Sequence, residues 1–535
     1  MEQIEIFIFL LGIIAIAGVL FRKVSVPTSL LLVIVGMLVS LLPFMPEVHI
    51  KSDLVLDIFL PLLIYEMSAE TSWRDIKVNL RPILSLSIGH VVFITVLVAV
   101  VIHTMIPSLG WPLAFVLGAV VAPPDDVAIM AIAEKANIPA RILTILRSEA
   151  MLNDATALIL FRFALTAYLT HQFSPQSAFG AFLMIVIGET LYGIALGNAM
   201  GKIRLTLTDP RQQMILSFLT PFLAYLPAER LGGCGVLATA VTGLVIGNRY
   251  YDKFLPEVRL ITHSVWTSIS FALQSVLFLL VGLNLKYIID RVDNSIDHQD
   301  MALYSLAVII TVIVGRFIWN YPSSYLPRFL FKSIREKDPY PPWQYPFVVS
   351  WSGMRGAISL AAAFSIPTLT GTGLGPHSRD LIIFFTFSVI CGTLLLQGLT
   401  LPWLLKLLGV ARYHEAEKVK DELEELKARK KMTQAAIAWL TEYENVVKDD
   451  PKLTAMVLLH IEQYRMRKLQ LSERSKSLKA GQEQDEVVEL SNTVKLSAKI
   501  LEVERKELSR LWHNEEISHA TRNKLMQQLD HRSKH

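Results

Sequence analysis

The sequence predicts an all-α membrane protein of about thirteen transmembrane helices, followed by a helical domain in water. Of its 535 residues, 52% are hydrophobic and only 18% are charged, which is too apolar for an ordinary soluble domain. Apolar stretches follow one another from Ile4 to Leu408, each close to the roughly 20 residues that a helix needs to cross a bilayer. After Leu408 the sequence becomes rich in charge and poor in glycine and proline. We therefore expect a transmembrane domain over 1–410 and a cytoplasmic tail over 411–535.

The expected spans form one continuous series with short polar breaks. Their apolar cores begin at Ile4, Pro27, Leu54, Pro82, Trp111, Ile142, Ala178, Met214, Gly235, Val265, Met301, Phe347 and Leu381. Glu2 and Glu5 precede the first span, where a cleaved signal peptide would carry positive charge. The first span is therefore expected to stay as a helix.

Lysine and arginine are distributed unevenly between alternate loops, and this predicts the orientation. The loops after odd-numbered spans hold seventeen of these residues and the loops after even-numbered spans hold five. Because short cytoplasmic loops are enriched in Lys and Arg, we expect the N-terminus outside the plasma membrane and the C-terminal tail in the cytoplasm. This loop bias also accounts for the net charge of +4, so no nucleic-acid partner is predicted.

The sequence of the tail predicts amphipathic helices in water. The segment KVKDELEELKARKK, which begins at Lys418, spaces apolar residues three and four apart. Asp449, Asp450 and Pro451 should end the first tail helix, and 479–484 should form a linker. The tail contains no nucleotide fingerprint and no metal-ligand cluster, so no cofactor is expected.

The fifth span contains a helix break at Ala122-Pro-Pro-Asp-Asp126. Pro123 and Pro124 have no N–H, so two carbonyls of the preceding turn lose their helical partners halfway across the bilayer. Broken helices with exposed carbonyls recur in transporters, where the carbonyls replace the hydration shell of an ion. Ala122, Pro124, Asp125 and Asp126 are therefore candidate ligands. The alternative is a simple kink capped by one of the two aspartates.

The sixth span carries Glu149-Ala-Met-Leu-Asn-Asp154 near its middle. An ionised side chain costs roughly 2.5–3.5 kcal/mol at the centre of a spanning helix, so Asp154 is a functional candidate. Ala150, one turn earlier, offers it no hydrogen bond. Burial raises the pKa of an aspartate and a nearby cation lowers it, so a proton and a metal cation would compete for this carboxylate. The alternative is a structural acid in a salt bridge.

Three arginines inside apolar spans are the available cationic partners: Arg162, Arg316 and Arg355. Arg355 lies between Gly353 and Gly356, which weaken the twelfth span at mid-membrane. Spans five and twelve are therefore alike in having an interruption at mid-membrane. Their separation fits two inverted six-helix repeats joined by the seventh span.

Other intramembrane polar residues are weaker candidates. Glu66 is a plausible auxiliary carboxylate, whereas Asp57 and Glu189 receive no role beyond a paired or cavity-facing charge. His90 and His103 are expected to be core or interface residues. Cys234 and Cys391 lie in apolar helices and are expected to be packing residues, with no disulfide framework.

The motifs of this chain resemble those of the cation/proton antiporter superfamily, in its sodium/proton exchanger branch and in the bacterial form with a helical tail. They are LPLLIYE ending at Glu66, APPDD at 122–126, SEAMLNDATALILFRFAL at 148–165, FLLVGLNL at 278–285, VGRFIW around Arg316, SGMRGAISLAAA at 352–363 and, near the end of the tail, EEISHATRNKLMQQLD at 515–530. The resemblance implies a homodimer whose six-helix cores move like elevators, and a tail that regulates or stabilises the dimer. It also implies a transporter that exchanges Na⁺, or K⁺ or Li⁺, for H⁺, and not an enzyme.

The resemblance further assigns residues. Asp154 would be the shared cation and proton site with Asn153 beside it, and this Asn-Asp form implies electroneutral one-for-one exchange. Glu149 would form a structural ion pair with Arg355. Two departures leave the choice of ion open, because Pro124 and Ala150 stand where the family often has threonine and serine. Backbone carbonyls, Asp125, Glu66 or water would then complete an oxygen shell.

Three other classes of membrane protein agree less well with the sequence than an antiporter does. A channel or uniporter could use the same broken helices, but the sequence has no filter-like repeat. An intramembrane enzyme would need a His-Glu-x-x-His pair or a Gly-x-Ser-x-Gly elbow, and neither occurs on any span. A structural scaffold would not need paired prolines and carboxylates at mid-depth.

Overall fold

The structure is a computed structural model that is helical throughout the part it describes. It describes residues 3–20, 28–42, 55–125, 138–172, 174–291, 298–367 and 376–479, with single residues or short runs between and after these ranges. None of the described residues forms a β-strand. The chain divides into two compact units, Met1–His414 and Glu415–His535.

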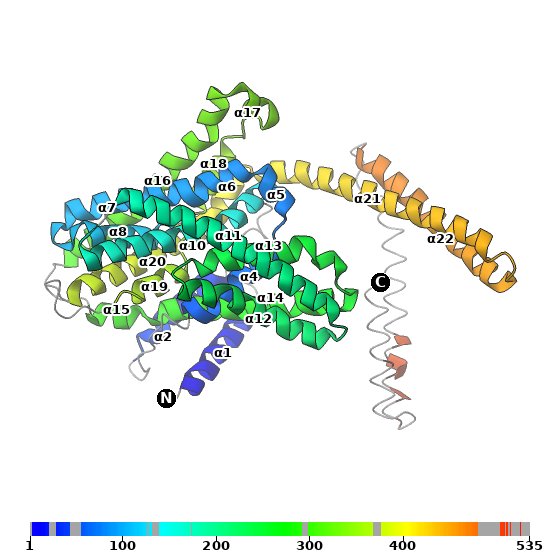
Figure 1. The fold of residues 1–535 in the computed structure, drawn as a ribbon, viewed down its shortest axis with the longest axis horizontal. Helices are drawn as coiled ribbons and strands as arrows, with labels where there is room; N and C mark the ends of the chain where they lie inside the picture. The colour runs from blue at the N-terminus through cyan, green and yellow to red at the C-terminus, as the bar shows by residue number, and fades with distance from the viewer. Residues whose placement is uncertain are drawn as a thin grey trace. The chain divides into compact units, whose positions relative to one another are not determined.

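The first half of the larger unit contains long apolar helices and several short helical segments (Figure 1). In chain order the elements are α1 (Gln3–Leu20), α2 (Thr28–Ser40), η2 (Val55–Phe59), α4 (Leu60–Glu70), α5 (Trp73–Val78), α6 (Leu80–Leu84), η3 (Ser85–His90), α7 (Val91–Met105), η4 (Pro107–Leu109), α8 (Gly110–Val121), α10 (Ala140–Thr170) and α11 (Pro175–Thr206). The π-helical turn η3 lies between α6 and α7, so these three elements form one continuous apolar rod over Leu80–Met105.

The second half also contains long helices, and it includes two consecutive short helices that are separated by a break. It contains α12 (Pro210–Arg230), α13 (Gly235–Arg249), η5 (Tyr251–Lys253), α14 (Pro256–Leu283), α15 (Leu285–Arg291), α16 (His298–Leu330), α17 (Lys332–Lys337), α18 (Gln344–Trp351), α19 (Ala357–Phe364) and α20 (Pro376–Leu407). In Figure 1 the end of α16 and the short α17 extend beyond the other helices of this unit.

The helical membrane architecture expected from the sequence is confirmed. Among the described residues, six helices are long and apolar enough to cross a bilayer on their own, and shorter apolar helices lie at 28–40 and 107–121. The number of crossings stays a prediction. The largest hydrophobic core includes buried residues of α7, α8, α18, α19 and α20. Gly118 of α8 lies directly against the carbonyl of Thr95 on α7, so these two helices touch backbone to backbone.

The smaller unit contains charged helices, as its composition predicts. Helix α21 (Ala411–Val446) ends just before the expected break, and α22 (Pro451–Lys479) begins after it. The carboxylate of Asp450 accepts hydrogen bonds from the amides of Lys452 and Leu453, at 3.0 and 3.2 Å, and so caps α22. Arg474 of α22 pairs with Glu422 of α21 at 2.6 Å. Most of the tail after Lys479, including the expected linker at 479–484 and the motif at 515–530, lies outside the described residues.

Candidate ion-binding site

Two broken segments meet in the interior of the larger unit. Helix α8 ends at Val121, just before Pro123 and Pro124, and the segment between α18 and α19 opens at Ser352–Gly356. The amide of Asp125 donates a 2.7 Å hydrogen bond to the carbonyl of Met354 and joins the two breaks. The crossing is this contact between the segments 122–125 and 352–356. Both breaks therefore occur where the prolines and glycines predict them. The helix expected after the first break, including Asp126, falls largely outside the described residues.

Gly356 is required at this crossing because the Asp125 side chain lies against its α-carbon. A Cβ at Gly356 would lie 2.7 Å from the Cβ, Cγ and Oδ1 atoms of Asp125, closer than side-chain atoms approach in folded proteins. The backbone of Gly356 is extended, with φ −112° and ψ −179°, so the requirement is steric. The glycine lets the second broken segment approach the first.

Gly356→Ala is expected to destabilise the protein by about 1–3 kcal/mol, the usual cost of adding a methyl group to a fully packed core. The melting temperature of the detergent-solubilised protein, followed by tryptophan fluorescence, measures this. Gly188→Ala is the matched control, because a Cβ there meets nothing within 4 Å. That change should be neutral or slightly stabilising, since alanine favours a helix more than glycine does. Equal melting temperatures for the two variants would show that the contact with Asp125 is not tight.

Asn153 connects the crossing to α10. Its Nδ2 donates a 3.0 Å hydrogen bond to the carbonyl of Pro124, and the side chain is fully buried. Its Oδ1 is a buried acceptor without a hydrogen-bond partner among the described residues. Asp154 is the next residue, near the middle of α10, and is half-buried. A buried amide oxygen beside a carboxylate offers hard oxygen ligands to a small cation.

Arg355 occupies a backbone carbonyl at the C-terminal end of α8, beside the first break. Its Nη1 donates to the carbonyl of Ala122, and its own amide donates a 3.1 Å hydrogen bond to Thr393 Oγ1. A guanidinium at the C-terminal end of α8 lies where the helix dipole favours a positive charge. Ala122 and Pro124, both expected as carbonyl ligands, thus already accept hydrogen bonds from Arg355 and Asn153.

The structure corrects the partner of Glu149. Both carboxylate oxygens of Glu149 accept from Arg316, at 2.6 and 2.8 Å, and each of the two residues is only 1% exposed. The expected pair of Glu149 with Arg355 is therefore wrong. The reason is packing: Gly353 has no side chain, so the Cδ of Arg316 can lie 2.6 Å from the position a Cβ would occupy. Arg316 also donates a 3.0 Å hydrogen bond from Nε to the carbonyl of Val349.

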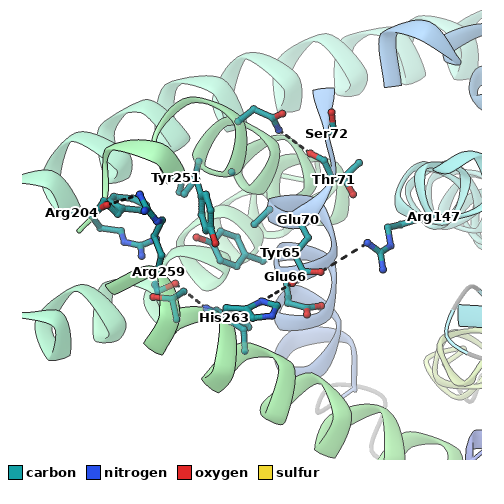
Figure 2. A pocket seen from close by; sticks show the side chains of 18 residues that line it. Tyr65, Glu66, Glu70, Thr71, Ser72, Arg147, Arg204, Tyr251, Arg259 and His263 are labelled. Atoms are coloured by element: carbon teal, nitrogen blue, oxygen red, sulfur yellow. Dashed lines mark hydrogen bonds and ion pairs between the residues drawn. The ribbon is translucent and has the colours of Figure 1, made fainter. Parts of the chain in front are cut away.

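Glu66 lies on the wall of a cavity of about 500 Å³. The described residues that line the cavity do not include Asp125, Asn153 or Asp154. They do include Glu70, which lies between Arg147 of α10 and His263 of α14, at 4.0 and 3.3 Å (Figure 2). Sequence reasoning missed Glu70, although it lies one helical turn after Glu66 and on the same face.

The remaining intramembrane charges have structural contacts. Arg162 binds the carboxylate of Glu229 and the carbonyl of Gly233, so it fastens α10 to the turn between α12 and α13. The carboxylate of Glu189 lies directly against Gly233. Asp57 lies in the π-helical turn η2.

His90, Cys234 and Cys391 are buried in the core, and His103 is half-buried. His90 is fully buried in η3, and His103 stacks on Trp111 with ring centroids 4.1 Å apart. Cys234 and Cys391 are buried free thiols. Within the described part of the chain, no three His, Cys, Asp or Glu side chains are grouped so that they could hold a metal ion.

This fold and this interior define a class of protein. Membrane-length helices accompany two broken segments that meet beside the Asn153–Asp154 pair, which is the arrangement of an ion-coupled membrane transporter. The chain belongs to the transmembrane sodium/hydrogen exchanger family, which it matches over residues 7–407. It is therefore an antiporter and not an enzyme, and the resemblance found in the motifs is confirmed.

Individual relatives agree with this assignment. An uncharacterized Na⁺/H⁺ exchanger of Mycobacterium tuberculosis is 33% identical over 403 residues, which cover 74% of this chain and 73% of that protein. A sodium, potassium, lithium and rubidium/H⁺ antiporter of Bacillus pumilus is 32% identical over 422 residues, or 76% of this chain and 61% of that protein. The solved structure of the sodium proton antiporter MjNhaP1 from Methanocaldococcus jannaschii shares the fold, with a TM-score of 0.59 and 17% identity over 75% of this chain and 97% of that one.

Proposed function

We propose that this antiporter exchanges Na⁺ for H⁺ by letting the two ions compete for the carboxylate of Asp154. The supporting observation is the neighbouring Asn153, whose Nδ2 is fixed to the carbonyl of Pro124 while its buried Oδ1 remains available. A dehydrated cation needs several oxygen ligands. Asn153 Oδ1 and Asp154 come from α10, and Asp125 comes from the first broken segment, which Asn153 joins to α10. Protonation of Asp154 removes the charge that attracts the cation.

One-for-one, electroneutral exchange follows from the fixed charges around this carboxylate. Glu149 and Arg316 neutralise one another in a bidentate pair, and Arg355 and Asp125 bring one charge of each sign to the crossing. Asp154 is then the group whose charge is cancelled in turn by H⁺ or by a monovalent cation. Both loaded states carry the same net charge, so the membrane potential would not drive the cycle.

Selectivity for Na⁺ over K⁺ or Li⁺ depends on which oxygen atoms complete the coordination shell of the cation. Pro124 and Ala150 bring no hydroxyl oxygen to the site, so water or a carbonyl completes the shell. The Bacillus pumilus relative is named for sodium, potassium, lithium and rubidium. We therefore propose Na⁺ as a substrate, with K⁺ and Li⁺ as further substrates.

Transport is proposed to follow an elevator mechanism in a homodimer of thirteen-helix protomers with inverted repeats. The breaks in expected spans five and twelve cross one another, as symmetry-related elements would. The cavity beside Glu66 and Glu70 lies between α4, α14 and α10, where a moving core would slide along the rest of the protomer. The N-terminus would face outward, and the tail over 411–535 would lie in the cytoplasm and regulate or stabilise the dimer.

Proton flux in proteoliposomes tests this function. A pH-sensitive dye is followed while Na⁺, K⁺ or Li⁺ is added, with and without a clamped membrane potential. We expect each effective cation to move protons at a rate that voltage does not change. Cation flux without proton movement would contradict the proposal and indicate a channel or uniporter.

A further inference from the structure

Three arginines from separate helices converge on a single carboxylate at one end of the bundle. Asp338 follows α17 and accepts from Arg81 Nη2 at 3.2 Å, from Arg141 Nη2 at 2.8 Å and from Arg328 Nη2 at 2.6 Å. Arg81 lies in α6, Arg141 in the first turn of α10 and Arg328 in the last turn of α16. None of the four residues of this arginine cluster is part of the Asn-Asp pair or of the two broken segments, and the proposed transport cycle does not use them.

The arginine cluster carries two more positive charges than negative ones among its described members. Guanidinium groups remain charged at any physiological pH, so their mutual repulsion cannot be relieved by deprotonation. Arg328 is only 4% exposed, and water therefore screens it poorly. Asp338 can satisfy only part of the donors that converge on it.

One donor of the arginine cluster is left without a partner. Arg81 Nη1 is buried and has no hydrogen-bond acceptor among the residues that the structure describes. A buried charged donor without an acceptor is costly, so a ligand atom at this position is expected.

A cavity of about 50 Å³ adjoins the arginine cluster and is lined by all three arginines, together with Ser323 and Asn320. A cavity needs roughly 10–15 Å³ to hold one water, so there is room here for a larger group. The side chains of Arg81 and Arg141 are about one-third exposed, at 32% and 35%, so a ligand can reach them from outside.

Exposed apolar and aromatic residues flank Arg328 and Asp338 along the chain. Leu326, Phe329 and Leu330 of α16 are exposed, and so are Tyr340 and Trp343 in the segment that follows α17. Exposed leucine and phenylalanine suit contact with acyl chains, and tyrosine and tryptophan gather at the level of lipid headgroups. Positive charge beside this surface favours an anionic lipid headgroup.

We infer that the arginine cluster is a binding site for a phosphate-type oxyanion, supplied by the headgroup of an anionic phospholipid. Arginine binds phosphate through paired N–H donors. Three guanidinium groups around one cavity therefore offer a phosphate more N–H donors than Asp338 alone can use. Asp338 then acts as a competitor that occupies the arginines when the ligand is absent. The inference does not depend on which ion is exchanged.

The role of Asp338 distinguishes this site from a purely structural ion-pair network. In a network that serves only to join helices, Asp338→Asn removes the central acceptor and nothing replaces it. In an oxyanion site, the same change removes the competitor and leaves three positive charges for the ligand. The two interpretations therefore differ: a structural network predicts that Asp338→Asn only loses stability, whereas an oxyanion site predicts that it retains or strengthens lipid binding at the arginines.

The test measures the rise in melting temperature that added lipid causes in the full-length protein in detergent. Phosphatidylglycerol, phosphatidylcholine and inorganic phosphate are compared for wild type, Arg81→Gln, Arg141→Gln and Asp338→Asn. Arg335→Gln is the matched control, because it removes an exposed positive charge from α17 outside the arginine cluster. Native mass spectrometry of the same samples counts bound lipid and does not depend on how stable each variant is.

We expect phosphatidylglycerol, but not phosphatidylcholine, to raise the melting temperature of wild type by several degrees. Arg81→Gln and Arg141→Gln should reduce that rise at least twofold, Arg335→Gln should retain it, and Asp338→Asn should retain or increase it. The same pattern with inorganic phosphate alone would support the site and assign a free anion as its source. Equal losses in Arg335→Gln and Arg81→Gln, or loss of lipid binding in Asp338→Asn, would overturn the inference.

Discussion

Asp154→Asn is expected to abolish cation-driven proton movement while the protein still folds. Asparagine keeps the size of the side chain and one oxygen, but it cannot release a proton or provide a charged ligand. A charge-assisted contact contributes about 3 kcal/mol, so its loss alone would lower exchange by about 100-fold. Since the proton carrier is lost with it, we expect no exchange above empty liposomes. Dye-detected proton flux in proteoliposomes with matched protein content measures the effect.

The control for this experiment is a second aspartate that lies outside the crossing. Asp252 is exposed in η5, and Asp252→Asn should leave exchange unchanged. Asp125→Asn distinguishes the role of Asp125 from that of Asp154. It should weaken the apparent cation affinity while some exchange remains. Full exchange by Asp154→Asn would move the shared site to another carboxylate, with Asp125 or Glu66 as the next to examine.

The two helix breaks could be predicted from the sequence because their causes are local. Pro123 and Pro124 remove hydrogen-bond donors whatever surrounds them, and Gly353 and Gly356 weaken a helix in any environment. The apolar stretches were equally predictable, since the length of a spanning helix depends only on bilayer thickness. Depth along a helix indicates Asp154, whereas Asn153 is assigned only by the resemblance to the family's Asn-Asp pair.

Partners across helices could not be predicted in the same way. Arg316 and Arg355 are both fully buried arginines, and only the packing of α16 against Gly353 decides which of them reaches Glu149. The arginine cluster at Asp338 also results from the packing of helices that are distant in the sequence. The sequence indicates basic loops at one face of the membrane, but it does not indicate that three of their arginines share one carboxylate.

Breaking the pair of Glu149 and Arg316 is expected to destabilise the protein more than any other single change. Glu149→Leu leaves Arg316 buried without its carboxylate, and Arg316→Met leaves Glu149 buried without its guanidinium. Each single variant should lose about 3–5 kcal/mol, because an uncompensated charge remains in a poorly hydrated interior. The double variant should be more stable than either single one, since no buried charge then remains. Thermal and denaturant unfolding in detergent measure the coupling between the two changes.

Two comparisons make this cycle decisive. The exposed pair of Lys332 and Glu336 in α17, 3.9 Å apart, should show a coupling of only about 0.3–0.5 kcal/mol. A second cycle between Glu149→Leu and Arg355→Met should give a much smaller coupling than the cycle with Arg316, because Arg355 donates to the carbonyl of Ala122 instead. If Arg355 instead showed the larger coupling, Glu149 would exchange partners during transport. The bidentate pair with Arg316 would then belong to one state of the cycle and not to the permanent framework.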